Sequence, residues 1–371
     1  MHRTPRCSGR ALTCPGHGAS PDRDNRSLRI QGAGRAVVKS IRQRPLAWAA
    51  PLGLGLAGCA GDTSILDPAG PAARDVALVW WGMLAFFTLV FVALVVLWLY
   101  TFRGGSRPER SAEDERRIGR HWILGGGILL PGVTIVVLLA WGVPAGQHML
   151  PLPIGKPPMV IEVVGHQWWW EVRYPDAEGG EVVTANQLVM PVGEPVDFHV
   201  TGADVIHAFW IPRLGGKIDM IPGRINRIRL EAEVPGVFGA QCAEFCGAQH
   251  ANMRLHVEAM PREEVEAWLA ARRPEPAPTP EHAEAREHFR EHCADCHRVA
   301  GVSEGDVGPD LSDIGVRATL GAGVMAMQEG AIADWLRHHQ AYKPGNRMPA
   351  HDDIDAETLE AIGAWLETLQ P

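Results

Sequence analysis

Residues 241–253 read Gln-Cys-Ala-Glu-Phe-Cys-Gly-Ala-Gln-His-Ala-Asn-Met, and the rest of the chain can be interpreted outward from this stretch. Cys242, Cys246, His250 and Met253 place two thiols, an imidazole and a thioether within twelve residues. Soft sulfur donors combined with imidazole are the ligands that copper takes in electron-transfer sites. Two thiolates four residues apart can bridge two ions, so the spacing predicts a dinuclear copper centre. A Cys242–Cys246 disulfide beside an unrelated His and Met is the alternative.

The pattern C-x-E-x-C-G-x-x-H-x-x-M resembles the CuA-binding loop of subunit II of the haem–copper cytochrome c oxidases. Residues 204–212, Asp-Val-Ile-His-Ala-Phe-Trp-Ile-Pro, resemble the segment that supplies a further histidine in that family. The resemblance implies a magnesium site, shared with the catalytic subunit, at the Glu244 side chain. It also implies that copper is bound by the Glu244 backbone carbonyl and by the side chains of His207, Cys242, Cys246, His250 and Met253.

Charge is distributed unevenly along the 371 residues, a length that predicts several domains. Residues 1–58 contain ten Lys/Arg against two Asp/Glu, whereas the remainder contains 25 against 41. An acidic mature chain argues against a nucleic-acid partner and suits a basic protein partner.

The segment 1–58 is interpreted as an N-terminal extension followed by a lipoprotein-type signal peptide. Residues 1–36 are rich in Arg, Gly, Pro and Ser, which is typical of disorder or of a start site placed too far upstream. A basic region from Lys39 and an apolar run from Leu46 to Leu56 precede Leu-Ala-Gly-Cys, a sequence that resembles a bacterial lipobox. We therefore expect lipidation at Cys59; a chance cysteine after an apolar run is the alternative. Residues 59–75 would then be a periplasmic segment.

Two uncharged runs of 25 residues, 76–100 and 122–146, predict a transmembrane helical hairpin over 76–146. Each would extend about 37 Å as a helix, enough to cross a bilayer with some tilt. The connection between them is rich in arginine, which marks the cytoplasmic side and places both ends of the hairpin outside. A buried hairpin of a soluble protein is the alternative. The family often has a Glu early in the second helix that is linked to proton entry; here Leu124 stands at that position, so this role is not transferred.

Residues 150–271 show short alternating runs separated by Gly and Pro, which predict a small β-sandwich or barrel. The resemblance implies a cupredoxin domain. It also implies that Trp168, in the segment Gly-His-Gln-Trp-Trp-Trp, is the point at which electrons enter; a purely structural role for all three tryptophans is the alternative. Lys217, Asp219 and Arg224 match a family loop that pairs with a neighbouring subunit or orients the site.

A Pro-rich linker, 272–283, separates this domain from a predicted cytochrome c domain over 284–371. Cys293-Ala-Asp-Cys296-His297 is a c-type haem attachment signature, in which the cysteines bind the macrocycle and His297 binds iron. A C-x-x-C redox pair is the alternative, although it does not explain the histidine. Met348, between Gly345 and Pro349, is the expected sixth ligand. His338, His339 and His351 are rival ligands, whereas Met325 and Met327 are expected to be core or surface residues.

The predicted fold is therefore multidomain: a two-helix transmembrane hairpin, an all-β cupredoxin domain and an all-α class I cytochrome c domain. The resemblance implies the electron-accepting subunit of a respiratory oxidase in a bacterial inner membrane, with copper and haem on the periplasmic face. Its expected partners are oxidase subunits I and III, membrane lipid, and cytochrome c or another periplasmic donor. Nitrous oxide reductase needs a large further domain, and quinol oxidases lack the copper ligands. A membrane-anchored copper-binding protein or metallochaperone with an appended cytochrome domain is the alternative from another functional class.

Overall fold

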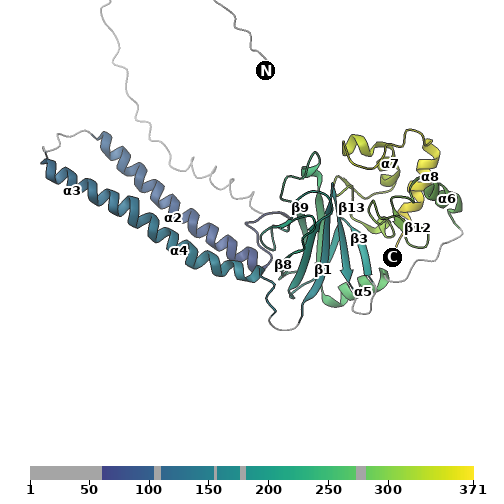
Figure 1. Cartoon of the computed structure of the whole chain (residues 1–371), viewed down its shortest axis with the longest axis horizontal. Coiled ribbons are helices and arrows are strands. Elements are labelled where there is room, and N and C mark those ends of the chain that lie inside the picture. Colours follow the sequence, from purple (N-terminus) through teal and green to yellow (C-terminus); the bar gives the residue numbers. More distant parts are fainter. Residues whose placement is uncertain (1–60, 104–109, 154–156, 176–180, 273–280) are drawn as a thin grey trace, which may run out of the picture. The chain divides into compact units, whose positions relative to one another are not determined.

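The computed structural model describes residues 61–103, 110–153, 157–175, 181–272 and 281–371. The predicted extension and signal peptide, together with Cys59, lie outside these residues. The described part contains the predicted helical hairpin, an all-β domain (the sandwich) and a helical C-terminal domain (the tail domain) (Figure 1).

The hairpin pairs α2 (Pro71–Phe102) with a continuous helical segment that starts at Ala112. That segment consists of α3 (Ala112–Trp122), a π-helical stretch η2 (Ile123–Leu129), α4 (Leu130–Ala145) and a 3₁₀ turn η3 (Gly146–Met149). Both helices are long and apolar enough to cross a membrane. They begin earlier than the uncharged runs suggested, because Pro71 suits a first helical turn and Ser111 caps α3 through the Asp114 amide.

The base of the hairpin is hydrogen-bonded to the sandwich. Arg74, in the first turns of α2, forms a two-pronged ion pair with Glu233, with N–O distances of 2.5 and 2.7 Å. The Ala69 amide donates to the Arg213 carbonyl at 2.8 Å, and the Ala69 carbonyl accepts from the Glu233 amide. The start of α2 is therefore held directly against the sandwich by an ion pair and by backbone hydrogen bonds.

The sandwich consists of two five-stranded sheets, as the alternating runs predicted. One sheet has the order β3-β2-β1-β5-β8 and the other β4-β10-β9-β6-β7. Neighbours are antiparallel except for the pairs β1–β5 and β10–β4. The strands are β1 (Met159–His166), β2 (Trp169–Pro175), β3 (Glu181–Ala185), β4 (Gln187–Pro191), β5 (Val196–Gly202), β6 (His207–Trp210), β7 (Ile218–Met220), β8 (Asn226–Leu230), β9 (Gly236–Cys242) and β10 (Arg254–Met260).

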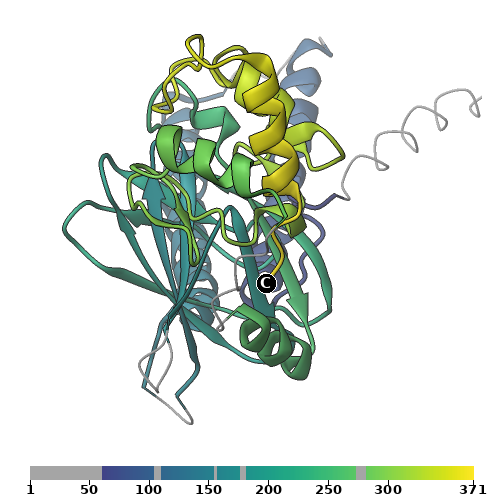
Figure 2. The ribbon, with the colours of Figure 1, turned by 90° about the vertical axis from the view of Figure 1, so that its right-hand side faces the viewer.

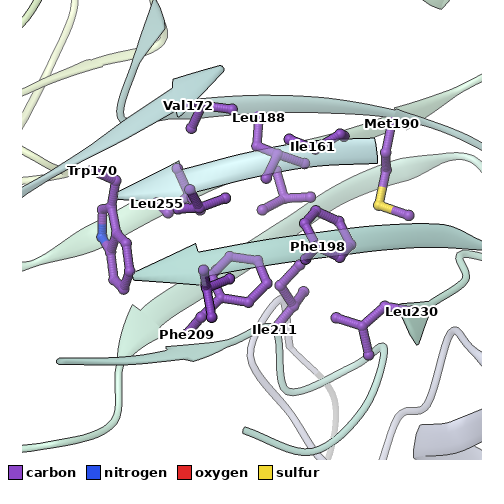
Figure 3. Close-up of a cluster of buried hydrophobic side chains, with 14 of the residues drawn as sticks. Ile161, Trp170, Val172, Leu188, Met190, Phe198, Phe209, Ile211, Leu230 and Leu255 are labelled. Carbon is purple, nitrogen blue, oxygen red and sulfur yellow. The ribbon is translucent and has the colours of Figure 1, made fainter. Parts of the chain in front are cut away.

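The two sheets bury one face of each strand in a shared apolar core. Figure 3 shows Trp170, Phe198 and Phe209 gathered with aliphatic side chains between the strands. Along β5, Val196, Phe198 and Val200 are buried while the residues between them are partly exposed, which is the period of two expected for a half-buried strand. This core is the rigid support for the loops that carry the candidate ligands.

The tail domain is built on three helices, α6 (Ala283–His292), α7 (Ala331–Tyr342) and α8 (Ala356–Glu367), of which α8 packs against the other two (Figure 2). Its core includes Phe289 and Trp365, whose rings meet edge to face with centroids 5.2 Å apart. Asp355 caps α8 through the Thr358 amide. Two short β-hairpins, β11 (Arg298–Val299) with β12 (Ser303–Glu304) and β13 (Thr319–Leu320) with β14 (Met325–Ala326), and a 3₁₀ turn η5 (Ile314–Val316) complete it.

A buried ionic network joins the last helix of the sandwich, α5 (Arg262–Arg272), to the tail domain. Asp313 pairs with Arg272 at 2.9 Å and with Arg317 at 2.6 Å, and all three side chains are more than nine-tenths buried. The Arg272 guanidinium also lies 3.7 Å from the ring centroid of Trp268. Burial opposes ionisation of Asp313, but Arg317 and Arg272 outweigh that effect and hold its pKa below the usual value.

We predict that Asp313→Asn makes the chain less stable at neutral pH and flattens its acid sensitivity. A lowered carboxyl pKa contributes stability that is present above the unfolded pKa of about 3.9 and is lost as the pH falls through the folded value. Breaking a buried pair leaves an uncompensated charge, so we expect a loss of about 3 kcal/mol at pH 7. Guanidinium denaturation at pH 7 and at pH 3 measures both effects, and the exposed Asp306→Asn is the control. If the free energy of unfolding of Asp313→Asn fell between pH 7 and pH 3 by as much as that of the wild type, the prediction would be contradicted.

Candidate functional site

The ends of the candidate copper loop are fixed by pairing between β9 and β10. Gln241 on β9 lies opposite Arg254 on β10, and the Cys242 amide donates to the Met253 carbonyl at 3.1 Å. The first and last candidate ligands of the loop therefore occupy neighbouring positions on two paired strands. The 3₁₀ turn η4 (His250–Asn252) brings His250 back toward them.

The predicted ligand atoms converge in this arrangement. The Sγ atoms of Cys242 and Cys246 are 3.7 Å apart, and Cys242 Sγ lies 3.9 Å from Nδ1 of His207. Cys246 Sγ lies 3.7 Å from Nδ1 of His250 and 3.9 Å from Sδ of Met253, while the Glu244 carbonyl is 3.2 Å from Cys242 Sγ. The structure thus brings together all six donors named from the sequence.

The donor set fits two copper ions better than the alternative disulfide. Both cysteines are free, and a sulfur–sulfur distance of 3.7 Å is far longer than the ~2.05 Å of a disulfide bond. Each sulfur has an imidazole nitrogen within 4 Å, that of His207 for Cys242 and that of His250 for Cys246. His207, Cys242, Cys246 and Met253 are buried, which suits a retained centre.

His207 is held by Asp204, three residues earlier on the same segment. Nε2 of His207 donates to Asp204 Oδ1 at 2.9 Å, which leaves Nδ1 directed at Cys242. Burial opposes protonation of His207, but Cys242 and Asp204 outweigh it and raise its pKa. The ring packs against Gly165, where an added Cβ would lie 3.0 Å from the imidazole.

The thiols influence one another strongly. The hydrogen bond from Cys246 lowers the pKa of Cys242 to about 3, with His207 acting in the same direction. The Cys242 thiolate in turn raises the pKa of Cys246. The Cys242 thiol therefore ionises readily, whereas ionisation of Cys246 beside it needs a compensating positive charge such as a bound cation.

The side chain of Glu244 points away from the sulfur cluster toward a partly exposed cation. Lys217 Nζ lies 3.3 Å from Glu244 Oε2 and 3.6 Å from Asp219 Oδ1. Lys217 and Asp219 were singled out in the sequence; here Lys217 contacts Ala243 and Glu244 of the copper loop, and Asp219 pairs with Lys217. Arg224 is exposed on the turn that follows β7.

Trp168 packs against the copper loop and is only 9% exposed. Its indole N–H donates to the Cys246 carbonyl at 3.0 Å, and Gln167 Nε2 donates to the same oxygen at 2.8 Å. Of the three consecutive tryptophans, Trp170 is fully buried and Trp169 lies partly exposed, stacked on His166. Trp168 is therefore the tryptophan bonded to a candidate copper ligand.

The haem signature lies in the tail domain directly after α6. Cys293 and Cys296 are free and partly buried, and Nδ1 of His297 lies 2.8 Å from the Pro309 carbonyl. A carbonyl can only accept, so Nδ1 carries the proton and Nε2 is left for a metal. Burial lowers the pKa of His297, which favours the neutral imidazole that binds iron. These residues fit a covalently attached haem.

Met348 lies on an irregular loop after α7, as its Gly and Pro neighbours predicted, and packs partly buried against the tail core. Two of its rivals are engaged elsewhere. His339 Nε2 lies 3.0 Å from the Pro349 carbonyl, and His338 pairs with Asp334 at 2.9 Å. His351 has a buried Nε2 without a partner among the described residues. Met325 and Met327 pack against the same core.

Sequence reasoning did not identify the residues that position these ligands. Asp204 stood in the quoted segment before His207, and its carboxylate beside a predicted ligand was the available signal. Gln340, which donates to the Met348 carbonyl at 2.7 Å, and Lys343 carried no comparable signal.

Comparison with known proteins gives two matched families. The model for "Cytochrome C oxidase subunit II, periplasmic domain" matches residues 179–260, and the model for "Cytochrome c" matches residues 282–370. These families imply a CuA copper site in the sandwich and a haem in the tail domain.

Individual relatives give the same result. Cytochrome c oxidase subunit 2 of Alkalihalophilus pseudofirmus is 35% identical over 337 residues, covering 86% of this chain and 95% of its own. The corresponding protein of Bacillus sp. strain PS3 is 32% identical over 229 residues, covering 58% and 63%. The crystal structure of the periplasmic domain of subunit II of cytochrome oxidase of Bradyrhizobium japonicum is 36% identical, covering 32% of this chain and 94% of that one, with a TM-score of 0.30.

We predict that Gly308→Val disturbs the His297 imidazole. A Cβ at Gly308 would lie 2.6 Å from Cε1 of His297, so the ring would have to move away from its bond to the Pro309 carbonyl. Visible and electron paramagnetic resonance spectra of the purified haem-containing chain should then change from low-spin toward high-spin iron. The neighbouring Val307→Ala, at an exposed side chain, should leave the spectrum unchanged; an unaltered spectrum for Gly308→Val would contradict the prediction.

Proposed function

Because the chain belongs to the cytochrome c oxidase subunit II family, we propose that it relays electrons from its own haem c through a dinuclear CuA centre to the oxygen-reducing subunit. Membership already makes it a subunit of a haem–copper oxidase that works with other oxidase subunits. The convergence of two thiolates, two imidazoles, a thioether and a carbonyl on one buried spot is the observation that carries the proposal.

When bound, the copper pair and the haem would each accept and release one electron at a time. The chain's own residues would determine where and how firmly they are held. Cys293 and Cys296 would attach the haem, and His297 Nε2 with Met348 Sδ would be the ligands of its iron. In the sandwich, the copper ions would be held by Cys242 and Cys246 together with His207, His250, Met253 and the Glu244 carbonyl.

Trp168 is the proposed route into the copper centre. Its indole N–H donates directly to the carbonyl of Cys246, so a continuous path of covalent and hydrogen bonds joins the ring to Sγ of Cys246. The ring also packs on Gly247, where an added Cβ would lie 2.9 Å from it. A tryptophan in this position would couple an adjacent donor to copper without itself binding metal.

The remaining assignments concern location and partners. Two helices able to span a membrane fit a membrane-anchored subunit, and we propose the bacterial inner membrane, with both metal domains on the periplasmic face. The proposed partners are subunits I and III, together with cytochrome c or another periplasmic donor. A magnesium ion at Glu244, shared with the catalytic subunit, and lipidation of Cys59 belong to the same proposal.

The metallochaperone alternative is weakened by burial. A chaperone must release its copper, whereas four of the candidate ligand side chains here are buried. Metal analysis of the purified full-length chain separates the two functions: we predict two copper ions per haem iron and the spectrum of a mixed-valence copper pair. A single exchangeable copper ion would overturn the relay proposal in favour of the chaperone.

Replacing Met348 tests the haem half of the proposal. Met348→Ala removes the proposed sixth ligand, so the Met-to-iron charge-transfer band should disappear while haem remains covalently attached. Met327→Ala is a matched control, because Met327 packs against the same core. Persistence of the band in Met348→Ala would mean that another methionine sulfur binds the iron, and Met325 also packs against this core.

A further inference from the structure

A buried ammonium group lies between the tail domain and the sandwich. Lys343, which directly follows α7, is 3% exposed, and its Nζ lies 2.7 Å from each of three carbonyl oxygens. Two of these acceptors, on Trp168 and Asn252, belong to the sandwich, and the third, on Gly321, belongs to the tail domain. One side chain therefore joins backbone of both domains.

The geometry matches the bonding capacity of a lysine. An ammonium group has three N–H donors, and here each has its own acceptor at hydrogen-bond distance. Burial lowers the pKa of Lys343 to about 7, and the negative charge of Cys246 acts in the opposite direction. Hydrogen bonds to carbonyl oxygens favour the charged form of the lysine. Because a buried charge is costly unless it is hydrogen-bonded, the lysine is held best when both domains supply their carbonyls.

Further contacts between the two domains lie next to the candidate copper ligands. Gln249 Nε2, beside His250, donates to the Pro344 carbonyl at 2.7 Å. The Arg254 amide, beside Met253, donates to the Ala322 carbonyl at 3.0 Å. Two segments of the tail domain, the β13–β14 turn at Ala322 and the loop after α7 at Pro344, therefore contact the sandwich next to candidate copper ligands.

The loop after α7 also contacts Asp204, the residue that holds His207. Arg347, adjacent to Met348, donates to the Gln167 side chain at 2.8 Å and lies 3.5 Å from Asp204. The loop from Lys343 to Met348 therefore carries a candidate haem ligand and also touches residues that contact or adjoin candidate copper ligands.

We propose that Lys343 is a positioning residue that seats the tail domain on the Trp168 face of the sandwich and so fixes the approach of haem to copper. This inference rests on the proposed relay function. The occupant of that face is the chain's own tail domain, so a soluble electron donor would dock on the tail domain instead of the copper loop.

The test uses the detergent-solubilised oxidase containing the full chain. Lys343→Met keeps an unbranched, largely apolar side chain but removes the charge and the three N–H donors of the lysine. We expect hydrogen exchange at the Arg254 amide to accelerate at least about tenfold, because that amide bonds across the interface. Electron equilibration from photoreduced haem to copper should slow by at least about tenfold. The Met348 charge-transfer band and the copper spectrum should remain those of the wild type.

Arg337→Met is the matched control, since it removes a cation of the tail domain that pairs at the surface with Glu360. Neither the exchange rate nor the electron-transfer rate should change. Should Lys343→Met fail to fold, Gln249→Ala removes a neighbouring contact from the sandwich side, and we expect a smaller effect of about threefold on both rates.

The results distinguish this inference from the relay function. Wild-type exchange and electron-transfer rates in a folded Lys343→Met protein, or in Gln249→Ala if only that variant folds, would overturn the positioning role and leave the relay intact. An oxidase whose wild-type haem does not reduce its copper would instead overturn the relay. In that case the rate of hydrogen exchange at the Arg254 amide, compared between the wild type and Lys343→Met, would still show whether Lys343 holds the tail domain on the sandwich.

Discussion

The pairing of β9 with β10 is the constraint on which the metal chemistry of this chain depends. By placing Gln241 opposite Arg254, the two strands close the ligand loop at its ends. The sheet and its apolar core support the loop at both of these ends. Ligands of the loop that are separated by up to seven residues in sequence can then meet within 4 Å.

A second set of contacts turns this loop into part of a larger assembly. The base of the membrane hairpin is tied to the sandwich through Arg74 and Glu233, and the end of α5 is tied to the tail domain through Arg272 and Asp313. These bonds lie far apart in sequence and join successive domains by charged groups. The sandwich is therefore the element to which both the membrane anchor and the haem domain are attached.

Much of this architecture could be predicted from the sequence because its strongest signals are local. Two long uncharged runs, alternating strands and two motifs with fixed spacing indicated the architecture, and the family resemblance implied the six candidate copper donors. The helix starts were missed because Pro71 and Ser111 extend the helices beyond the apolar runs. Three consecutive glycines, 125–127, lie within a π-helical stretch that composition does not reveal. The roles of Lys343 and Gln340 could not be foreseen, since their acceptors are backbone carbonyls brought close only by folding.

That choice of acceptors bears on how the protein can change over evolutionary time. The three oxygens that receive Lys343 belong to the main chain at Trp168, Asn252 and Gly321, and every residue type carries the same carbonyl. Substitution of the side chain at Trp168 or Asn252 does not remove the carbonyl acceptor, provided that the backbone path is kept. At Gly321, where φ is +60° and an added Cβ would lie 2.4 Å from Trp335, substitution is restricted by sterics. The contact is therefore tolerant of mutation on the sandwich side and vulnerable at the single lysine.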